Sequence, residues 1–256
     1  MSFSDDQLTK DKFLGGRLHL WQPKTGYRAA TDPVLLAAAV DARPGDRVLD
    51  LGCGAGAAIL CLQRRIADLR GFGLEVQADY ANLARRNADE NGLDLTVVDG
   101  DLAAMPTVLR EMVFDHVIAN PPFHPATHTG AMDAGRDVAQ RDMAGLLSRW
   151  IDAGLRRLVR GGDLTVIHRA DRLAAVLAAL GDRAGDIRIL PIAPRIGRAA
   201  GRVIVTARKG SKAGATLLTP LVMHEGRVHV TDGDDYSQRA RGILREMLPI
   251  GLFTQP

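Results

Sequence analysis

Cysteine, lysine, aromatic residues and long apolar runs are all scarce in this chain of 256 residues. Its two cysteines, Cys53 and Cys61, are too few for a disulfide framework and are typical of a protein of the reducing cytoplasm. The purest long apolar run, residues 34–40, is far too short to span a bilayer. The N-terminus also lacks the basic and then apolar profile of a signal peptide. We therefore expect a cytoplasmic protein without a membrane partner.

Apolar residues make up 46% of the chain and charged residues 25%, which fits a soluble globular protein and excludes intrinsic disorder and a collagen-like structure. The length suits one large α/β domain or two small ones. The net charge is only +3, but the basic residues are 28 arginines and 5 lysines. A GC-rich genome would produce such an excess. A phosphate-binding surface would also require it, because guanidinium groups match phosphate oxygens.

From residue 46 onward, short β-like runs alternate with helical patterns. The predicted strands are residues 47–51, 72–76, 95–98, 114–119 and 164–168, and the predicted helices are residues 55–66, 77–91, 102–110, 138–160 and 172–180. Such alternation predicts an α/β fold with a mostly parallel sheet covered on both faces. Two later runs, 187–192 and 202–207, predict an antiparallel pair at the edge. We therefore expect a Rossmann-like, seven-stranded sheet with an antiparallel edge strand.

The end of the chain changes rhythm. Residues 217–223 and 227–231 predict a small hairpin, and Asp234 and Asp235 could cap a last helix. The expected buried face of that helix consists of Tyr236, Ala240, Ile243, Leu244 and Met247. We divide the chain into an N-terminal cap segment (1–45), a core (46–210), and a C-terminal hairpin and helix attached to the same domain (211–256).

A glycine-rich turn stands between the first strand and the first helix of the core. Gly52, Gly54 and Gly56 allow the backbone to turn tightly and approach a ligand, and Cys53 is a small residue that fits such a turn. The spacing also fits the loose dinucleotide fingerprint, which keeps a nicotinamide enzyme open. Asp50, two residues before the first glycine, would repel a pyrophosphate and suits an ammonium group instead.

Acidic residues also follow the second and third strands. Glu75 ends the second strand, where a carboxylate can accept hydrogen bonds from ribose hydroxyls. Asp101 follows the third strand and can face the exocyclic amine of an adenine, a role for which Asp99 competes. Ammonium, ribose and adenine in strand order describe S-adenosylmethionine. These residues resemble the cofactor motifs of class I methyltransferases, which implies that fold and that cofactor.

The fourth strand ends in Asn120, Pro121, Pro122 and Phe123. The prolines stop the strand and fix the backbone, so the Asn120 side-chain carbonyl and the Pro121 main-chain carbonyl can accept from one substrate amine. Phe123 offers a face on which a planar group can stack. This arrangement positions and polarises an amine rather than acting as a strong base. The motif resembles that of N6-adenine and glutamine-amide methyltransferases and does not choose between a base and a side-chain amide.

Two flanking segments add to the central motifs: residues 27–37, which contain Arg28, Thr31 and Asp32, and residues 232–237, Asp-Gly-Asp-Asp-Tyr-Ser. Together the motifs resemble the bacterial tRNA1(Val) adenine-37 N6-methyltransferase family over nearly the whole chain. The resemblance implies S-adenosylmethionine as cofactor, an adenine amine of RNA as substrate, and tRNA in the first place. It places Thr31 and Asn120 at the cofactor, and Arg28 and Asp32 over the substrate pocket. Phe123 departs from the commoner tyrosine.

Other substrates remain open. Glutamine-amide methyltransferases of release factors resemble the same core, but usually carry a separate helical N-terminal domain, for which about 45 residues are too few. A DNA adenine is the other alternative substrate, and a non-catalytic nucleic-acid-binding module is an alternative of another class. His124 and His128 lack further ligands at metal-binding spacing, so we expect no metal and place His124 near the substrate.

Basic residues concentrate between residues 156 and 212, which hold 13 basic and four acidic residues, a net charge of +9. Arg195, Arg198 and Arg202 lie in the connector of the edge pair. They predict a phosphate-binding patch, and a solvated arginine-rich face is the alternative. The sequence predicts no particular oligomeric state.

Overall fold

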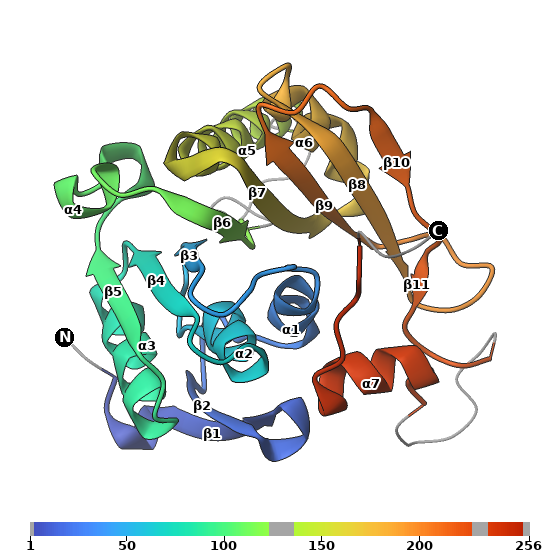
Figure 1. Ribbon diagram of the computed structural model, residues 1–256. Coiled ribbons are helices and arrows are strands. Elements are labelled where there is room, and N and C mark those ends of the chain that lie inside the picture. Colours follow the sequence, from blue (N-terminus) through green and yellow to red (C-terminus); the bar gives the residue numbers. More distant parts are fainter. Residues whose placement is uncertain (1–2, 123–135, 227–234, 253–256) are drawn as a thin grey trace.

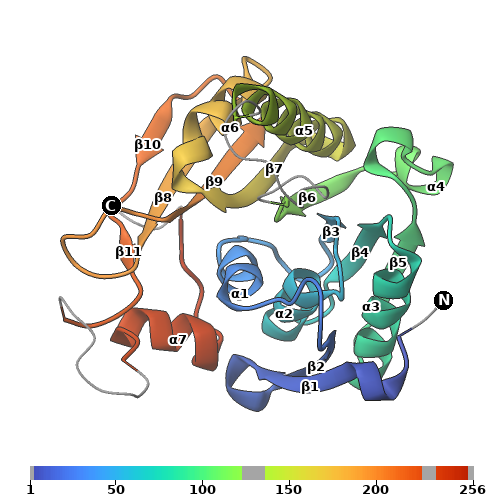
Figure 2. The same cartoon turned by 180° about the vertical axis from the view of Figure 1, so that it is seen from behind.

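A mostly parallel sheet with helices on both faces forms the centre of the protein (Figures 1 and 2). The computed structural model describes residues 3–122, 136–226 and 235–252. The strands are β3 (Arg47–Leu51), β4 (Arg70–Glu75), β5 (Leu95–Asp99), β6 (Phe114–Ala119), β7 (Leu158–Arg169), β8 (Ala184–Ala193), β9 (Arg202–Lys209), β10 (Ala215–Leu217) and β11 (Leu221–Val222). Their order is β10-β8-β9-β7-β6-β3-β4-β5, and β11 also pairs with β8. The expected fold class is thereby confirmed.

The antiparallel pair at the far side of the sheet consists of β8 and β9. Strand β9 runs antiparallel to both β7 and β8 and lies between them. The start of β9 therefore lies at the same edge of the sheet as the carboxyl ends of the parallel strands. Within the described residues, β10 and β11 lengthen the predicted seven-stranded sheet to nine strands, and both pair parallel with β8.

Successive residues of the central strands point to opposite faces, and each face is buried under its own helices. The helices are α1 (Thr31–Ala38), α2 (Ala57–Arg65), α3 (Ala78–Glu90), α4 (Thr107–Arg110), α5 (Arg136–Arg157), α6 (Leu173–Leu180) and α7 (Gln238–Glu246). Val48, Ile118 and Ile204 pack in the cluster of α1, α2 and α7. Leu49 and Val117, one residue along, pack in the cluster of α4, α5 and α6. This alternation is the reason that both faces of the strands are apolar.

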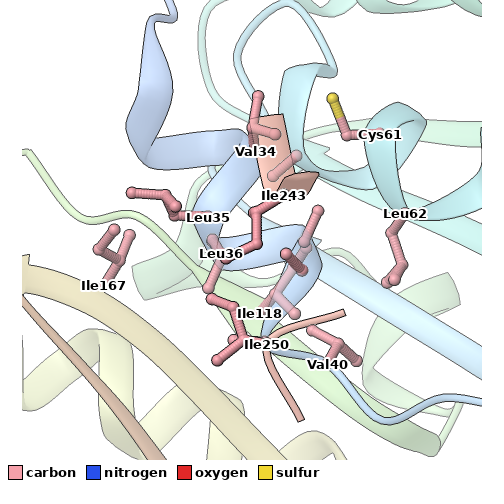
Figure 3. Packing of buried hydrophobic residues seen from close by; sticks show 14 of the residues in the cluster. Val34, Leu35, Leu36, Val40, Cys61, Leu62, Ile118, Ile167, Ile243 and Ile250 are labelled. Atoms are coloured by element: carbon pink, nitrogen blue, oxygen red, sulfur yellow. The ribbon is translucent and has the colours of Figure 1, made fainter. Parts of the chain in front are cut away.

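Helix α1 is buried along almost its whole length. Residues 33–40 are all buried, between the sheet and α2 and α7. Figure 3 shows Leu36 of α1 close to Ile118 of β6 and Ile250. A helix that is apolar on every side belongs in a protein core or a membrane. The apolar run 34–40 is thus a core helix, and no helix among the described residues is both long and apolar enough to cross a membrane.

The N-terminal segment contains a separate two-stranded sheet that the sequence did not predict. Strands β1 (Leu8–Phe13) and β2 (Leu18–Pro23) pair antiparallel, and the 3-10 turn η2 (Leu14–Gly16) joins them. Asn87 of α3 accepts from the Trp21 N–H at 2.7 Å and donates to the Trp21 carbonyl at 3.1 Å. Asn91 bonds the backbone of His19 in the same way. Asn87 of α3 and Asn91, which follows the helix, thus pair with β2 as a neighbouring strand would.

The C-terminal segment differs from the expected hairpin. The run 217–223 contains β11 and the last residue of β10, two strands that join the sheet beside β8, and residues 227–231 lie outside the described residues. The cap of α7 is Ser237, whose hydroxyl accepts from the Ala240 N–H at 3.1 Å. The expected capping by Asp235 is therefore wrong, because Asp235 lies too far ahead of the helix, and Asp234 is outside the described residues. Ala240, Ile243 and Leu244 form the buried face as predicted.

Candidate cofactor and substrate site

The glycine turn joins β3 to α2 in a left-handed conformation. The φ angles of Gly52, Gly54 and Gly56 are 60°, 55° and 85°, which explains why glycine stands at each position. A Cβ on Gly52 would lie 2.3 Å from Cη2 of Trp150 on α5. Cys53 is buried, and its N–H donates to the Leu74 carbonyl at 3.0 Å. Burial and the nearby acids raise the pKa of the Cys53 thiol, so this cysteine is a packing residue and no nucleophile.

Two carboxylates lie beside this turn. Asp50 is 3% exposed at the end of β3, and burial raises its pKa to about 8, with a backbone hydrogen bond from Ile59 opposing the rise and Glu75 adding to it. Glu75 is 5% exposed at the end of β4. Its Oε2 accepts from the Gly54 N–H at 2.8 Å and its Oε1 from the Gln77 N–H at 2.9 Å. Two neighbouring buried acids make this a place for a positively charged ligand.

Asp99 and Asp101 have different partners at the end of β5. Asp99 forms an ion pair with Arg85 of α3, whose guanidinium also donates to the Val97 carbonyl. Asp101 is exposed and begins the 3-10 turn η3 (Leu102–Ala104), where its Oδ1 accepts from the Ala103 N–H at 2.8 Å. Asp99 is thus tied to α3, whereas Asp101 stands at the carboxyl edge of the sheet.

Asn120 follows β6 and meets a residue from the N-terminal segment. Its Nδ2 donates to the Tyr27 hydroxyl at 3.2 Å, and the Tyr27 carbonyl accepts from the Tyr80 hydroxyl at 3.0 Å. The Tyr27 ring lies about 3.8 Å from where a Cβ of Gly54 would be. Desolvation of its hydroxyl, Asp50 and Asp32 raise the pKa of Tyr27 to about 12, so the hydroxyl stays protonated. Tyr27 therefore connects the amine-binding motif to the glycine turn.

Tyr27 was not among the site residues predicted from the sequence. The signal that could have found it is its place at the start of the segment 27–37.

The motif after Asn120 is described only as far as Pro122. Pro121 is buried, Pro122 is exposed, and both line a small pocket with His168 of β7. Phe123 and His124 lie outside the described residues. Burial lowers the pKa of His168 to about 4, which keeps its imidazole neutral.

The two flanking motifs meet across a groove. Thr31 at the start of α1 and Tyr236 before α7 both line a groove of about 530 Å³, together with Gln22 and Arg245. Asp32 pairs with Arg202 of β9 at 2.9 Å. Arg28, by contrast, holds the N-terminal hairpin, since it donates to Thr9, Asp11 and the Pro23 carbonyl. Helix α1 starts at Thr31, and its cap position, Ala30, carries no side-chain bond.

The predicted phosphate-binding patch is largely built into ion pairs. Arg195 pairs with Asp235, which also bonds His224, and the His224 ring stacks on Tyr236 with centroids 4.9 Å apart. Arg198 is exposed. Other cations of the stretch 156–212 also have acidic partners: Arg156 and Arg183 with Asp152, Arg169 with Asp171, Arg188 with Asp186, and Arg208 with Asp163 and Asp186. Among the described residues, no group of three potential ligands could hold a metal ion.

Comparison with known proteins adds a family. The sequence pattern of the methyltransferase small domain matches residues 30–182. A tRNA1(Val) (adenine(37)-N6)-methyltransferase of Porphyromonas gingivalis is 28% identical over 195 residues, which cover 71% of this chain and 76% of the relative. A ribosomal RNA small subunit methyltransferase C of Stutzerimonas stutzeri is 40% identical over 96 residues, which cover 37% of this chain and only 27% of the relative.

Two solved structures share the fold. A predicted O-methyltransferase of Agrobacterium tumefaciens has a TM-score of 0.66 and 31% identity, with 83% of this chain and 94% of that chain covered. A 16S rRNA N2 G1207 methyltransferase of T. thermophilus, in complex with AdoMet and guanosine, has a TM-score of 0.55 and 20% identity, with 79% and 50% covered. Because the small-domain pattern spans more than half of the chain, this protein belongs to the methyltransferase small domain family and is an S-adenosylmethionine-dependent methyltransferase of class I fold.

Proposed function

We propose that this enzyme methylates the exocyclic N6 amine of an adenine in RNA, and that the RNA is a tRNA of the cytoplasm. The observation that carries the proposal is the contact between Asn120 and Tyr27, which joins an amine-binding motif to the glycine turn. The similarity to a tRNA adenine methyltransferase over 71% of the chain supports the choice of base and polymer. So does the meeting of the two flanking motifs, Thr31 and Tyr236, at one groove.

The cofactor residues follow from the strand ends. Gly52, Gly54 and Gly56, with Cys53 between them, would form the cradle of S-adenosylmethionine. Glu75 would accept from the ribose hydroxyls and Asp101 from the adenine amine. Asp101 is the better candidate than Asp99, because Asp99 is already paired with Arg85. Asp50 would stabilise the positive charge of the ligand from below the turn, and Thr31 and Asn120 would border the methionine end.

The substrate residues act on one amine. S-adenosylmethionine supplies a methyl group on a positively charged sulfur. Asn120 Oδ1 and the Pro121 carbonyl would each accept a hydrogen of the substrate amine and hold its lone pair toward that methyl group. The hydrogen bond from Asn120 Nδ2 to Tyr27 fixes the amide so that Oδ1 is the atom left for the substrate. The methylated amine loses its extra proton to water. The Tyr27 hydroxyl is already protonated, and the His168 imidazole, whose pKa is lowered to about 4, binds a proton only weakly.

The test is transfer of labelled methyl groups to total tRNA, ribosomal RNA, DNA and protein, followed by nucleoside analysis. We expect N6-methyladenosine in tRNA from the wild-type enzyme. Asn120→Ala should lower kcat at least 100-fold, and Tyr27→Phe about 3- to 10-fold, at similar affinity for S-adenosylmethionine. Label found only in DNA or only in protein would contradict the RNA assignment and identify that polymer as the substrate. A wild-type enzyme that transfers no label to any of them would favour a non-catalytic nucleic-acid-binding module.

One other product is favoured by a specific observation. A ribosomal RNA methyltransferase is 40% identical over 96 residues, and the exocyclic amine of guanine would meet Asn120 and Pro121 as that of adenine does. Nucleoside analysis separates the two, because N2-methylguanosine in ribosomal RNA would show this alternative and contradict the adenine assignment.

A further inference from the structure

A groove lined by four arginines lies beside α5, and the function proposed above gives it no role. Its volume is about 510 Å³, and its cationic walls are Arg110 of α4 together with Arg149, Arg156 and Arg157 of α5. The rest of the lining consists of Leu102, Ala103, Ala104, Met105, Asp152 and Ala153. The groove therefore runs between α5 and the segment that follows Asp101.

The spacing along α5 builds this groove. Arg149, Asp152, Ala153 and Arg156 follow one another at intervals of three, one and three residues, which places them on one face of the helix. Ala153 has a small side chain, so the middle of that face stays open. Arg149 and Arg156 are separated by about 10 Å along the helix axis. Such a length is enough for roughly two or three consecutive phosphate groups of one strand.

The positive charge of the groove exceeds its negative charge. Asp152 is the one carboxylate among the described lining residues, and it is shared between Arg156 at 2.9 Å and Arg183 at 2.6 Å. Arg149 is exposed. Arg110 is exposed as well and donates to the Thr107 hydroxyl at 3.1 Å. These two guanidinium groups can therefore turn to an anion without breaking an ion pair.

Arg157 has a structural task at the end of the groove. It donates to the carbonyls of Leu109, at 3.3 Å, and of Arg110, and so satisfies carbonyl groups at the end of α4. This bond holds α4 against α5 and fixes the wall that carries Arg110. The groove is thus preformed: Arg157 holds its wall in place, and Arg110 and Arg149 are available for a ligand.

The groove adjoins the methyl-transfer site through α5. Trp150, next to Arg149, lies against Gly52 of the glycine turn. Leu102 to Met105, which line the groove, directly follow the proposed adenine ligand Asp101. A polyanion bound in the groove would consequently pass close to the cofactor. Several other arginines of the C-terminal half have acidic partners, as Arg202 has in Asp32 and Arg208 in Asp163.

We propose that this groove binds the phosphodiester backbone of the RNA substrate, away from the nucleotide that is methylated. The proposal rests on the RNA substrate proposed above. Arginine forks bind phosphate oxygens in a bidentate manner, and such contacts position a nucleic acid without reading its sequence. The groove would thereby hold the RNA in register with Asn120.

The test compares two double variants of equal charge. Arg110→Ala/Arg149→Ala removes two cations of the groove, and Arg43→Ala/Arg70→Ala removes two exposed arginines at the opposite, amino edge of the sheet. Binding of fluorescein-labelled tRNA is measured by anisotropy between 50 and 300 mM salt, about the range over which phosphate contacts are lost. For the groove variant we expect affinity at the lowest salt to fall about 10-fold or more, and the slope of log K against log salt to drop by about 2. The control double should bind as the wild type does.

Cofactor affinity and steady-state kinetics separate this proposal from the proposed function. The groove variant should keep wild-type affinity for S-adenosylmethionine and show a raised KM for tRNA at a nearly unchanged kcat. Wild-type tRNA binding by the groove variant, or an equal loss in both doubles, would overturn the groove proposal while leaving the enzyme's product untouched. Absence of methylated RNA from the wild-type enzyme would instead refute the proposed function, whatever the binding curves show.

Discussion

Asp50 carries a carboxyl group that the surrounding protein makes costly to ionise. It is 3% exposed, burial raises its pKa to about 8, and Glu75 adds to the rise. The backbone hydrogen bond from Ile59 offsets only part of this. Strongly perturbed acids in a cleft are a mark of functional sites, where stability is given up for binding. We infer that a cationic ligand next to the glycine turn compensates for the burial of Asp50.

Asp50→Asn should therefore stabilise the free protein and weaken its binding of S-adenosylmethionine. The pKa of Asp50 is about 8 in the folded protein against an ordinary value of 3.8, so between these pH values the folded state holds a proton that the unfolded chain has lost. Wild-type stability should fall as pH rises through this window, and the variant should lack that fall. We expect the advantage of the variant over the wild type to grow by about 4 kcal/mol between pH 5 and pH 9.

Thermal unfolding of both proteins from about pH 5 to 9, without ligand, measures this difference. Calorimetric titration with S-adenosylmethionine should show affinity reduced about 10-fold in the variant, which is about 1.4 kcal/mol. Equal pH dependence of unfolding in the two proteins would show that Asp50 is ionised at no cost.

Single residues of the site could be predicted from the sequence where they lie at the end of a strand or in a glycine turn. Gly52, Gly54, Gly56 and Glu75 follow from local spacing, because the carboxyl ends of parallel strands meet at one edge. Tyr27 did not follow, since it is 93 residues from its partner Asn120 and no spacing rule connects them. The same holds for Asp32, whose partner Arg202 is 170 residues away. Contacts between distant segments require the topology, which a single sequence encodes only indirectly.

At the scale of elements, the position of α5 is set by two glycines. A Cβ on Gly154 would lie 2.8 Å from Leu164 of β7, so the helix can pack this closely only with glycine there. The approach brings Trp150 against Gly52, where a Cβ would lie 2.3 Å from the indole ring. Helix α5 thus supports the glycine turn at Gly52, and Tyr27 lies near the same turn at Gly54.

Gly52→Ala should disturb both stability and cofactor binding. Alanine at a φ of 60° is strained by about 1 kcal/mol, and its methyl group also collides with Trp150. We expect a loss of about 2–4 kcal/mol in the free energy of unfolding, and weaker binding of S-adenosylmethionine. Gly92→Ala is a matched control, because Gly92 has a φ of 62° but no atom within 4 Å of its added Cβ.

The double variant Gly52→Ala/Trp150→Leu separates the collision from the backbone strain. Trp150→Leu should recover part of the loss when combined with Gly52→Ala, although it is destabilising alone. Guanidinium chloride unfolding and calorimetric titration measure the two effects. If Gly52→Ala lowers the free energy of unfolding no more than Gly92→Ala does, the Trp150 side chain moves aside without cost and the collision argument is contradicted.

Elements with a clear periodicity or a turn signal were predictable, and those with neither were not. The alternating strands and helices between 47 and 180 correspond to the predicted ones within a few residues, with two exceptions: β7 starts early, and the predicted helix 102–110 is the turn η3 followed by the short α4. Strand β1 was missed because Thr9, Lys10 and Asp11 in its centre are polar, and its stability comes from β2. Strand β11 was assigned to a hairpin because its sequence does not reveal that its neighbour is β8.

At the scale of the molecule, folding rearranges the charge that the sequence displays. The stretch 156–212 has a net charge of +9 when it is counted along the chain. In the structure, acids from outside the stretch pair with it: Asp32 with Arg202, Asp152 with Arg183, and Asp235 with Arg195. The connector 194–201 is therefore less cationic than its sequence indicates. The groove beside α5 keeps its excess, because Asp152 is the single carboxylate that accompanies its four arginines among the described lining residues.

The two ends of the chain are fastened to each other and to the core. Arg17 of the N-terminal segment donates to the Arg245 carbonyl of α7 at 2.6 Å, and the Ile250 N–H donates to the Ala38 carbonyl of α1 at 2.8 Å. Ile243, Leu244, Ile250 and Leu252 are all buried in the cluster around α1. Figure 3 shows Ile243 and Ile250 among the side chains of α1. The segment after residue 211 is thus part of the hydrophobic core and is not merely attached to its surface.

Removal of the part of this segment that follows residue 225 should prevent folding altogether. Burial of four large aliphatic side chains contributes about 6–12 kcal/mol, as much as the whole stability of a typical domain. A chain that ends at residue 225 should therefore be unfolded or aggregated by circular dichroism. The milder change Ile243→Ala should cost about 2–5 kcal/mol and lower Tm by roughly 4–20 °C. Leu217→Ala is the control, because Leu217 is 69% exposed and should change Tm by less than about 2 °C. A truncated chain that unfolds cooperatively and still binds S-adenosylmethionine would show that α7 is a separable attachment.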